Sequence, residues 1–128
     1  MNKIYTIARI VFGLMMIGSG LAMLILGGFP TEYENAIAQV YMNALEETGF
    51  FIPLLAIVKI VCGVAWVSNR FVPLALVIFM PVSVNMVIFH LALEPLTGVG
   101  AYVIFILNIY IMVKNLPSYK MLLKSKTN

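Results

Sequence analysis

A single lysine, Lys59, interrupts an otherwise apolar stretch that reads AIVKIVCGVAW from Ala56 to Trp66. An ionisable side chain inside an apolar helix is costly to keep and is by default a candidate for function. No acid lies at the same depth in the neighbouring apolar segments to neutralise it. The ammonium group either stays charged in a wet cavity or becomes neutral, and it donates hydrogen bonds to an anionic or carbonyl-bearing ligand. Lys59 is therefore the first candidate for a ligand-binding residue.

Four further polar side chains lie at comparable depths in the apolar segments. Asn85 and Asn108 fall near the level of Lys59, and His90 and Glu94 lie one to two helical turns nearer one end. Together they predict a polar layer that binds a ligand. The asparagines also fit a simpler interpretation as interhelical hydrogen-bond partners, and His90 fits one as an interface residue. We assign no catalytic residue to this set.

The same residues argue against a metal or thiol centre. The chain has one cysteine, Cys62, and one histidine, so it has no CxxC motif and no paired His/Cys ligands. An intramolecular disulfide is excluded for the same reason. We predict no metal site and no thiol redox centre.

The elements that position these residues are apolar helices. The 128 residues are 62% hydrophobic and only 10% charged, with a mean hydropathy of +1.04. A soluble domain is normally about half apolar and about a quarter charged. We predict an all-α, single-domain membrane protein over residues 1–128, a transmembrane antiparallel four-helix bundle. The expected spans are about 5–27, 49–68, 71–93 and 97–115, each near the ~20 residues that cross the hydrocarbon core.

The charges are segregated along the chain and predict its topology. All acids fall between the first and second spans or between the third and fourth. The bases, Lys59 aside, fall at the two ends and between the second and third spans. Because Lys and Arg next to spans stay cytoplasmic, we expect both termini in the cytoplasm. The bases flank spans and do not form an aromatic-interleaved patch, so we expect membrane lipids and no nucleic acid as partners.

The acidic segment between the first two spans predicts an external helix over about 31–47. Thr31 and Glu34 form a T-x-x-E capping box, and Gly49 is a natural stop. Apolar residues recur at helical spacing and give one face: Tyr33, Ile37, Val40, Tyr41, Ala44 and Leu45. An amphipathic helix of this kind lies at the membrane interface or caps a cavity.

Small residues predict where the spans approach each other closely. Gly13 and Gly20 share a stripe of the first span with Arg9, and Gly63 shares the helical face of Lys59 in the second. Lys59 is thus expected to point into the protein. Arg9 is expected to be a packing residue of this stripe, near enough to the membrane boundary that its side chain can snorkel. Pro81 is expected to kink the third span.

Several stretches resemble the DoxX family of small four-helix membrane proteins. They are IARIVFGLMMIGSGL, MNALEETGFFIPLL and KIVCGVAWVSNRFVPLALVIFMPVSVNMVIFHL, which together cover most of the chain. The resemblance implies a bacterial cytoplasmic-membrane protein, and some relatives are membrane subunits beside soluble oxidoreductases in quinone-linked redox systems. Relatives usually carry a glutamate where this chain has Lys59, so the charge at this site is reversed.

Three functions follow as hypotheses. The first is an accessory membrane subunit that binds a quinone or another amphiphile in the polar layer and associates with a soluble oxidoreductase partner, without catalytic activity of its own. The second is a lipid or amphiphile binder or transporter, for which four spans imply a homo-oligomer. The third is a purely structural membrane scaffold.

Overall fold

The computed structural model describes residues 3–27 and 33–126, and that part of the chain is all-helical. It contains α1 (Lys3–Leu26), α2 (Ala36–Glu47), α3 (Phe51–Ser68), α4 (Val72–Leu93) and α5 (Val99–Lys114), with short 3₁₀ turns η1 (Pro95–Thr97) and η2 (Leu116–Tyr119). No strand occurs within those ranges. The all-α prediction is confirmed, and the four apolar helices begin and end within two residues of the expected spans.

Three of these helices, α1, α3 and α4, are long and apolar enough to cross a membrane. With 24, 18 and 22 residues, they extend over about 36, 27 and 33 Å at a rise of about 1.5 Å per residue. The hydrocarbon core of a bilayer is about 30 Å thick. The expected fourth span corresponds to α5, whose 16 residues reach only about 24 Å.

The outer surface of the long helices is apolar. Only 33% of the most apolar window of each is buried inside the protein. Large side chains such as Ile7, Val61 and Ile88 are more than half exposed. A soluble monomer rarely exposes contiguous apolar surface on this scale, so the three helices support an integral membrane protein.

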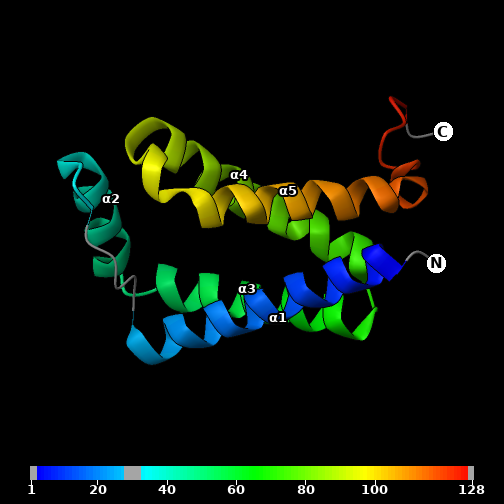
Figure 1. The fold of residues 1–128 in the computed structure, drawn as a ribbon, viewed down its shortest axis with the longest axis horizontal. Helices are drawn as coiled ribbons and strands as arrows, with labels where there is room; N and C mark the ends of the chain where they lie inside the picture. Colours follow the sequence, from blue (N-terminus) through cyan, green and yellow to red (C-terminus); the bar gives the residue numbers. More distant parts are fainter. Residues whose placement is uncertain (1–2, 28–32, 127–128) are drawn as a thin grey trace.

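Successive apolar helices reverse direction, and α1 lies along α3 while α4 lies along α5 (Figure 1). The beginning of α1, the α3–α4 connection and the end of α5 lie at one end of the molecule, and α2 lies at the other (Figure 1). Basic residues flank the helices at the first end, whereas Glu46, Glu47 and Glu94 lie at the end where α2 is found. We call these the basic end and the acidic end.

Helices α1 and α3 are in the closest contact because glycines line their crossing. A Cβ atom at Gly63 would lie 2.6 Å from the carbonyl oxygen of Gly13, and one at Gly13 would lie 2.8 Å from that of Gly63. About two turns along, a Cβ atom at Gly20 would lie 2.8 Å from the carbonyl oxygen of Ala56. The absence of side chains at these positions lets the two backbones touch.

Next to this crossing, three buried aromatic rings join α1, α3 and α4. Phe12 stacks on Trp66 with ring centroids 4.3 Å apart. Phe79 meets both rings edge-on, at centroid distances of 5.9 and 5.5 Å. Such pairs contribute about 0.5–1.5 kcal/mol beyond the area they bury, so this cluster stabilises the half of the protein nearer the basic end.

Arg9 is buried, as a packing residue would be, and does not use its position near the boundary to snorkel. Its side chain is only 7% exposed. Nη1 donates to the carbonyl oxygen of Trp66 and, at 3.5 Å, to that of Val67. Both carbonyls belong to the last turn of α3, where backbone acceptors lack helical partners and the helix dipole favours a cation. The end of α3 therefore provides Arg9 with acceptors inside the protein.

The external helix α2 begins later than predicted. Its N-cap is Asn35, whose side-chain oxygen accepts hydrogen bonds from the backbone N–H groups of Ile37 and Ala38. Thr31, the expected cap, lies outside the described residues. The predicted end is confirmed, because Gly49 has a φ of +77° just after the helix and donates its N–H to the carbonyl of Glu46.

Candidate functional site

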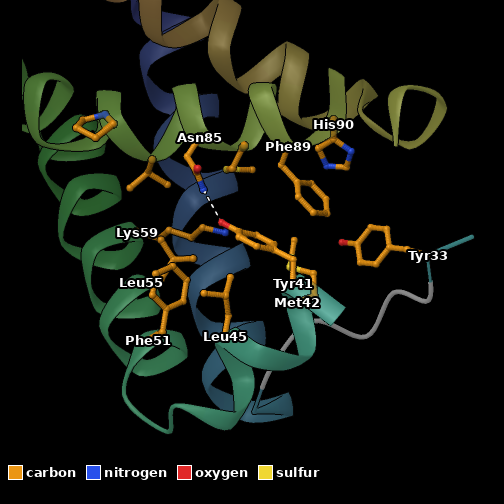
Figure 2. Close-up of a pocket in the computed structure, with 13 residues that line it drawn as sticks. Tyr33, Tyr41, Met42, Leu45, Phe51, Leu55, Lys59, Asn85, Phe89 and His90 are labelled. Carbon is orange, nitrogen blue, oxygen red and sulfur yellow. Dashed lines mark hydrogen bonds between the residues drawn. The ribbon is translucent and has the colours of Figure 1, made fainter. Parts of the chain in front are cut away.

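A cavity of about 390 Å³ lies between α2, α3 and α4. We call it the Lys59 pocket. Its wall includes Leu55 and Lys59 from α3, Asn85, Phe89 and His90 from α4, and Tyr41 and Leu45 from α2 (Figure 2). The volume lies within the range of about 300–1,000 Å³ that is typical of small-molecule sites.

Lys59 reaches the pocket from the face of α3 that packs on α1. The side chain is only 5% exposed, and its Nζ donates to Ser19 Oγ of α1 at 3.0 Å. Gly20, next to Ser19, lets α1 approach α3 closely enough for this contact. An ammonium group has three N–H donors, and Ser19 uses one. The remaining donors are available to a molecule in the pocket.

Asn85 is the second polar group of the pocket. Its Nδ2 donates to the hydroxyl oxygen of Tyr41 at 3.1 Å, which connects α4 to α2. Figure 2 shows the side chains of Lys59, Asn85 and Tyr41 converging from three different helices. The three side chains combine N–H donors with a hydroxyl that both donates and accepts.

Aromatic rings form the wall toward the acidic end. Tyr41 stacks on Phe89 at a centroid distance of 5.3 Å, and Tyr33 meets Phe89 edge-on at 5.5 Å. Burial raises the pKa of Tyr33, and the carboxylates of Glu94 and Glu46 raise it further. Tyr33 is therefore a neutral hydroxyl at physiological pH, and the wall is apolar with polar tips.

His90 lines the pocket beside these rings. Its ring is edge-on to Phe89 at 5.1 Å, and Nδ1 lies 3.2 Å from the backbone carbonyl oxygen of Glu94. Since that carbonyl accepts, the contact is a hydrogen bond when Nδ1 carries the proton. The helical turn between the two residues thus orients the imidazole in the wall of the pocket.

Glu94 lies next to the pocket and does not line it in the described part of the chain. Its side chain is 7% exposed, and Oε1 accepts the backbone N–H of Asn35 at 2.7 Å. Asn35 caps α2, so Glu94 holds the beginning of that helix against the end of α4. The geometry gives Glu94 a positioning role.

Asn108 is separated from the other predicted ligand residues. It is fully buried between α5 and α4, where Nδ2 donates to Ser83 Oγ at 3.3 Å. Its Oδ1 is buried and has no hydrogen-bond partner among the described residues. The structure therefore brings Lys59, Asn85 and His90 together, and it places Asn108 as the interhelical hydrogen-bond partner that was its alternative interpretation. Pro81 lies within α4 and also lines the pocket.

The sequence left open whether the external helix caps a cavity, and in the structure part of its predicted apolar face does so. Tyr41 and Leu45 do face the pocket, but Ile37 and Val40, assigned to the same apolar face, are 67% and 68% exposed. The helix has apolar residues on more than one side, so its pattern alone does not say which side covers the protein. Phe89 was missed because a phenylalanine in an apolar span carries no signal of its own.

The described residues contain no group of three His, Cys, Asp or Glu side chains that would hold a metal ion. The pocket offers the Lys59 amino group, an amide and hydroxyl groups next to aromatic faces. Such a set recognises a ligand with oxygen acceptors attached to an apolar or aromatic body.

Comparisons of the chain with protein-family models, with curated proteins and with solved structures find no match. The DoxX resemblance thus stays a prediction.

Proposed function

We propose that this chain is a DoxX-like membrane protein that binds an amphiphilic small molecule in the Lys59 pocket. In this proposal α5 is the fourth span of an antiparallel bundle in a bacterial cytoplasmic membrane, with the basic end in the cytoplasm. The observation that carries the proposal is the convergence of Lys59, Asn85 and Tyr41 on one cavity whose remaining wall is apolar and aromatic.

The polarity of the wall selects the ligand's head. The described lining residues include no acid, and Lys59 and Asn85 both present N–H donors. A carbonyl or anionic oxygen therefore finds donors here, whereas a cationic head is repelled by Lys59. A quinone satisfies this requirement: its oxygens accept from Lys59 and Asn85, and its ring has the aromatic faces of Tyr41 and Phe89 beside it. The association with a soluble oxidoreductase follows from the family resemblance and forms part of the same proposal.

Lys59 supplies the test, because methionine keeps the length of the side chain and removes the donors. We would compare wild-type protein with Lys59→Met by native mass spectrometry after gentle detergent extraction, and analyse the lipid extract of both for quinones. Lys114→Met is a matched control, since Lys114 lies over the Tyr110 ring outside the pocket. A bound amphiphile is expected in wild type and in the control and not in Lys59→Met.

Two results would count against the proposal. If wild-type protein carries no amphiphile and binds no added quinone, the pocket is not a binding site. If Lys59→Met carries the same adduct at the same occupancy, Lys59 is not its contact. The structural scaffold would be favoured if neither wild type nor Lys59→Met carries an adduct and Lys59→Met is at least as stable as wild type. A scaffold has no use for a buried charge, which is costly to keep.

A transporter is the second candidate, and the attachment of α2 favours it. The contacts of α2 with α4 include two hydrogen bonds, Asn35 to Glu94 and Asn85 to Tyr41, and the rings stacked on Phe89. A wall formed by a separate helix of 12 residues is suited to open and close. Ligand-dependent uptake into proteoliposomes, absent in Lys59→Met, would distinguish a transporter from a binding subunit.

A further inference from the structure

A second cavity, separate from the Lys59 pocket, lies between α3 and α4 toward the basic end. It has a volume of about 660 Å³ and is open to the surroundings along the two helices. We call it the α3–α4 groove. Its wall consists mostly of aliphatic side chains, including Val61, Leu74 and Ile78, which are 62%, 56% and 50% exposed. It shares no lining residue with the Lys59 pocket.

The polarity of the groove is asymmetric along its length. Among the described lining residues, Ser68 and Arg70 are the polar ones apart from Cys62, and both lie at the basic end. Ser68 Oγ donates to the carbonyl oxygen of Ala65, so the hydroxyl is engaged with its own helix. The exposed Arg70 guanidinium is thus the group that marks one end of an apolar channel.

The residue after Arg70 is held in an unusual conformation. Phe71 has a φ of +56°, in the left-handed region that bulky side chains rarely adopt, and its ring is 76% exposed. It lines the groove beside Arg70. The connection from α3 to α4 therefore places a cation and an apolar ring side by side at the basic end of the groove.

The dimensions of the groove limit what occupies it. From Ile57 to Ser68 its α3 wall extends about 17 Å, at a rise of about 1.5 Å per residue. An apolar groove of this length accommodates linear hydrocarbon chains along the two helices.

From these observations we propose that the α3–α4 groove binds one anionic phospholipid, with its acyl chains between the helices and its phosphate on Arg70. Arginine is suited to this role because its planar guanidinium binds phosphate oxygens through two parallel hydrogen bonds. The other bases of the basic end add an attractive field for an anionic headgroup. The occupant is a lipid of the leaflet at the basic end.

The test uses the full chain, stripped of co-purified lipid in detergent and titrated with phosphatidylglycerol or phosphatidylcholine of identical acyl chains. Native mass spectrometry counts the adducts. Wild type is expected to prefer phosphatidylglycerol by about fivefold, the effect of one basic residue near an anionic headgroup. Arg70→Gln is expected to lose the preference, and Lys114→Gln, also at the basic end but outside the groove, is expected to keep it.

A second pair of variants tests the groove itself. Val61→Phe fills the channel from an exposed position, and Ile106→Phe makes the corresponding change on α5, where the side chain is 64% exposed and outside the groove. Val61→Phe is expected to reduce the adducts of both lipids, and Ile106→Phe to leave them unchanged. Lys59→Met is expected to keep the lipid preference, which separates this site from the Lys59 pocket.

The inference is overturned if wild type binds both lipids equally, or if Lys114→Gln lowers the preference as much as Arg70→Gln does. Loss of the adduct in Lys59→Met would place the lipid in the other pocket. If Val61→Phe instead disrupts a dimer and leaves lipid adducts intact, the groove is an interface between two copies of this chain.

Discussion

Replacing Gly63 with alanine is expected to force α1 and α3 apart. The new Cβ atom would lie 2.6 Å from the carbonyl oxygen of Gly13, 2.7 Å from Ile17 Cγ1 and 3.1 Å from the backbone nitrogen of Ile17. Ordinary contacts begin at 3.4 Å, so α1 must withdraw by about 0.8 Å, the difference between 3.4 and 2.6 Å. Two of the three atoms belong to the backbone, and no rotamer change relieves them.

The free energy of unfolding is expected to fall by about 2–3 kcal/mol. Overpacking of a close contact costs about 1–3 kcal/mol. A gap of 0.5–1 Å also removes a quarter to a half of each dispersion contact along the separated surfaces. The value should lie in the upper part of the range because the α1–α3 crossing is the closest helix contact of the fold.

The assay is an SDS titration in mixed micelles, followed by the fluorescence of Trp66. Trp66 is the only tryptophan, and it stacks on Phe12 of α1, so its emission reports the separation of α1 from α3. Gly18→Ala is the control, since a Cβ atom there meets nothing within 4 Å. That variant should be unchanged or up to about 1 kcal/mol more stable, because alanine favours helix. Equal effects of the two substitutions would refute the close-packing explanation.

Three further results are expected. In a double-mutant cycle of Tyr41→Phe and Asn85→Leu, the coupling free energy should be about 0.6 kcal/mol. A coupling free energy of zero would contradict a stabilising hydrogen bond between the two side chains. Arg9→Met should lower the free energy of unfolding by about 1.5–3 kcal/mol, because the Trp66 carbonyl loses a charged donor; equal stability in SDS titration would contradict this. Burial, with help from neighbouring carboxylates, raises the pKa of Tyr33 above 10.0, so the unfolded chain loses that proton first. Stability contributed by this residue is present below about pH 10 and is lost as the pH rises through the folded pKa. Tyr33→Phe should therefore lose less stability than wild type between about pH 9 and about pH 11, and identical losses would exclude this origin.

The helices were predictable because their signals are local. Apolar runs of about 20 residues define the spans, and Gly49 ends α2 as its lack of a Cβ atom allows. The glycines of α1 and α3 also predicted a face of close approach. Lys59 accordingly turns toward α1, as its position beside Gly63 indicated.

The composition of the site was only partly predictable, because residues at the same depth in different helices do not have to be in contact. Asn85 and Asn108 lie at similar depths, yet the rotation of each helix about its axis directs Asn85 to Tyr41 and Asn108 to Ser83. Depth follows from counting along a span. The rotation of a helix about its axis depends on which neighbouring helix it packs against. When apolar residues lie on all sides of a helix, its sequence has no amphipathic pattern that would show which face is buried.

By itself, the sequence determined that this chain is helical and apolar enough for a membrane, that its charges divide between two ends, and that Lys59 is the exceptional side chain. The tertiary structure alone decided that Arg9 binds the end of α3, that α2 covers a pocket with Tyr41, and that Arg70 ends a groove between α3 and α4. The physical reason is that hydropathy and turn chemistry act within a segment. Hydrogen-bond partners and cavities arise between segments, where the order and rotation of packed helices set every distance.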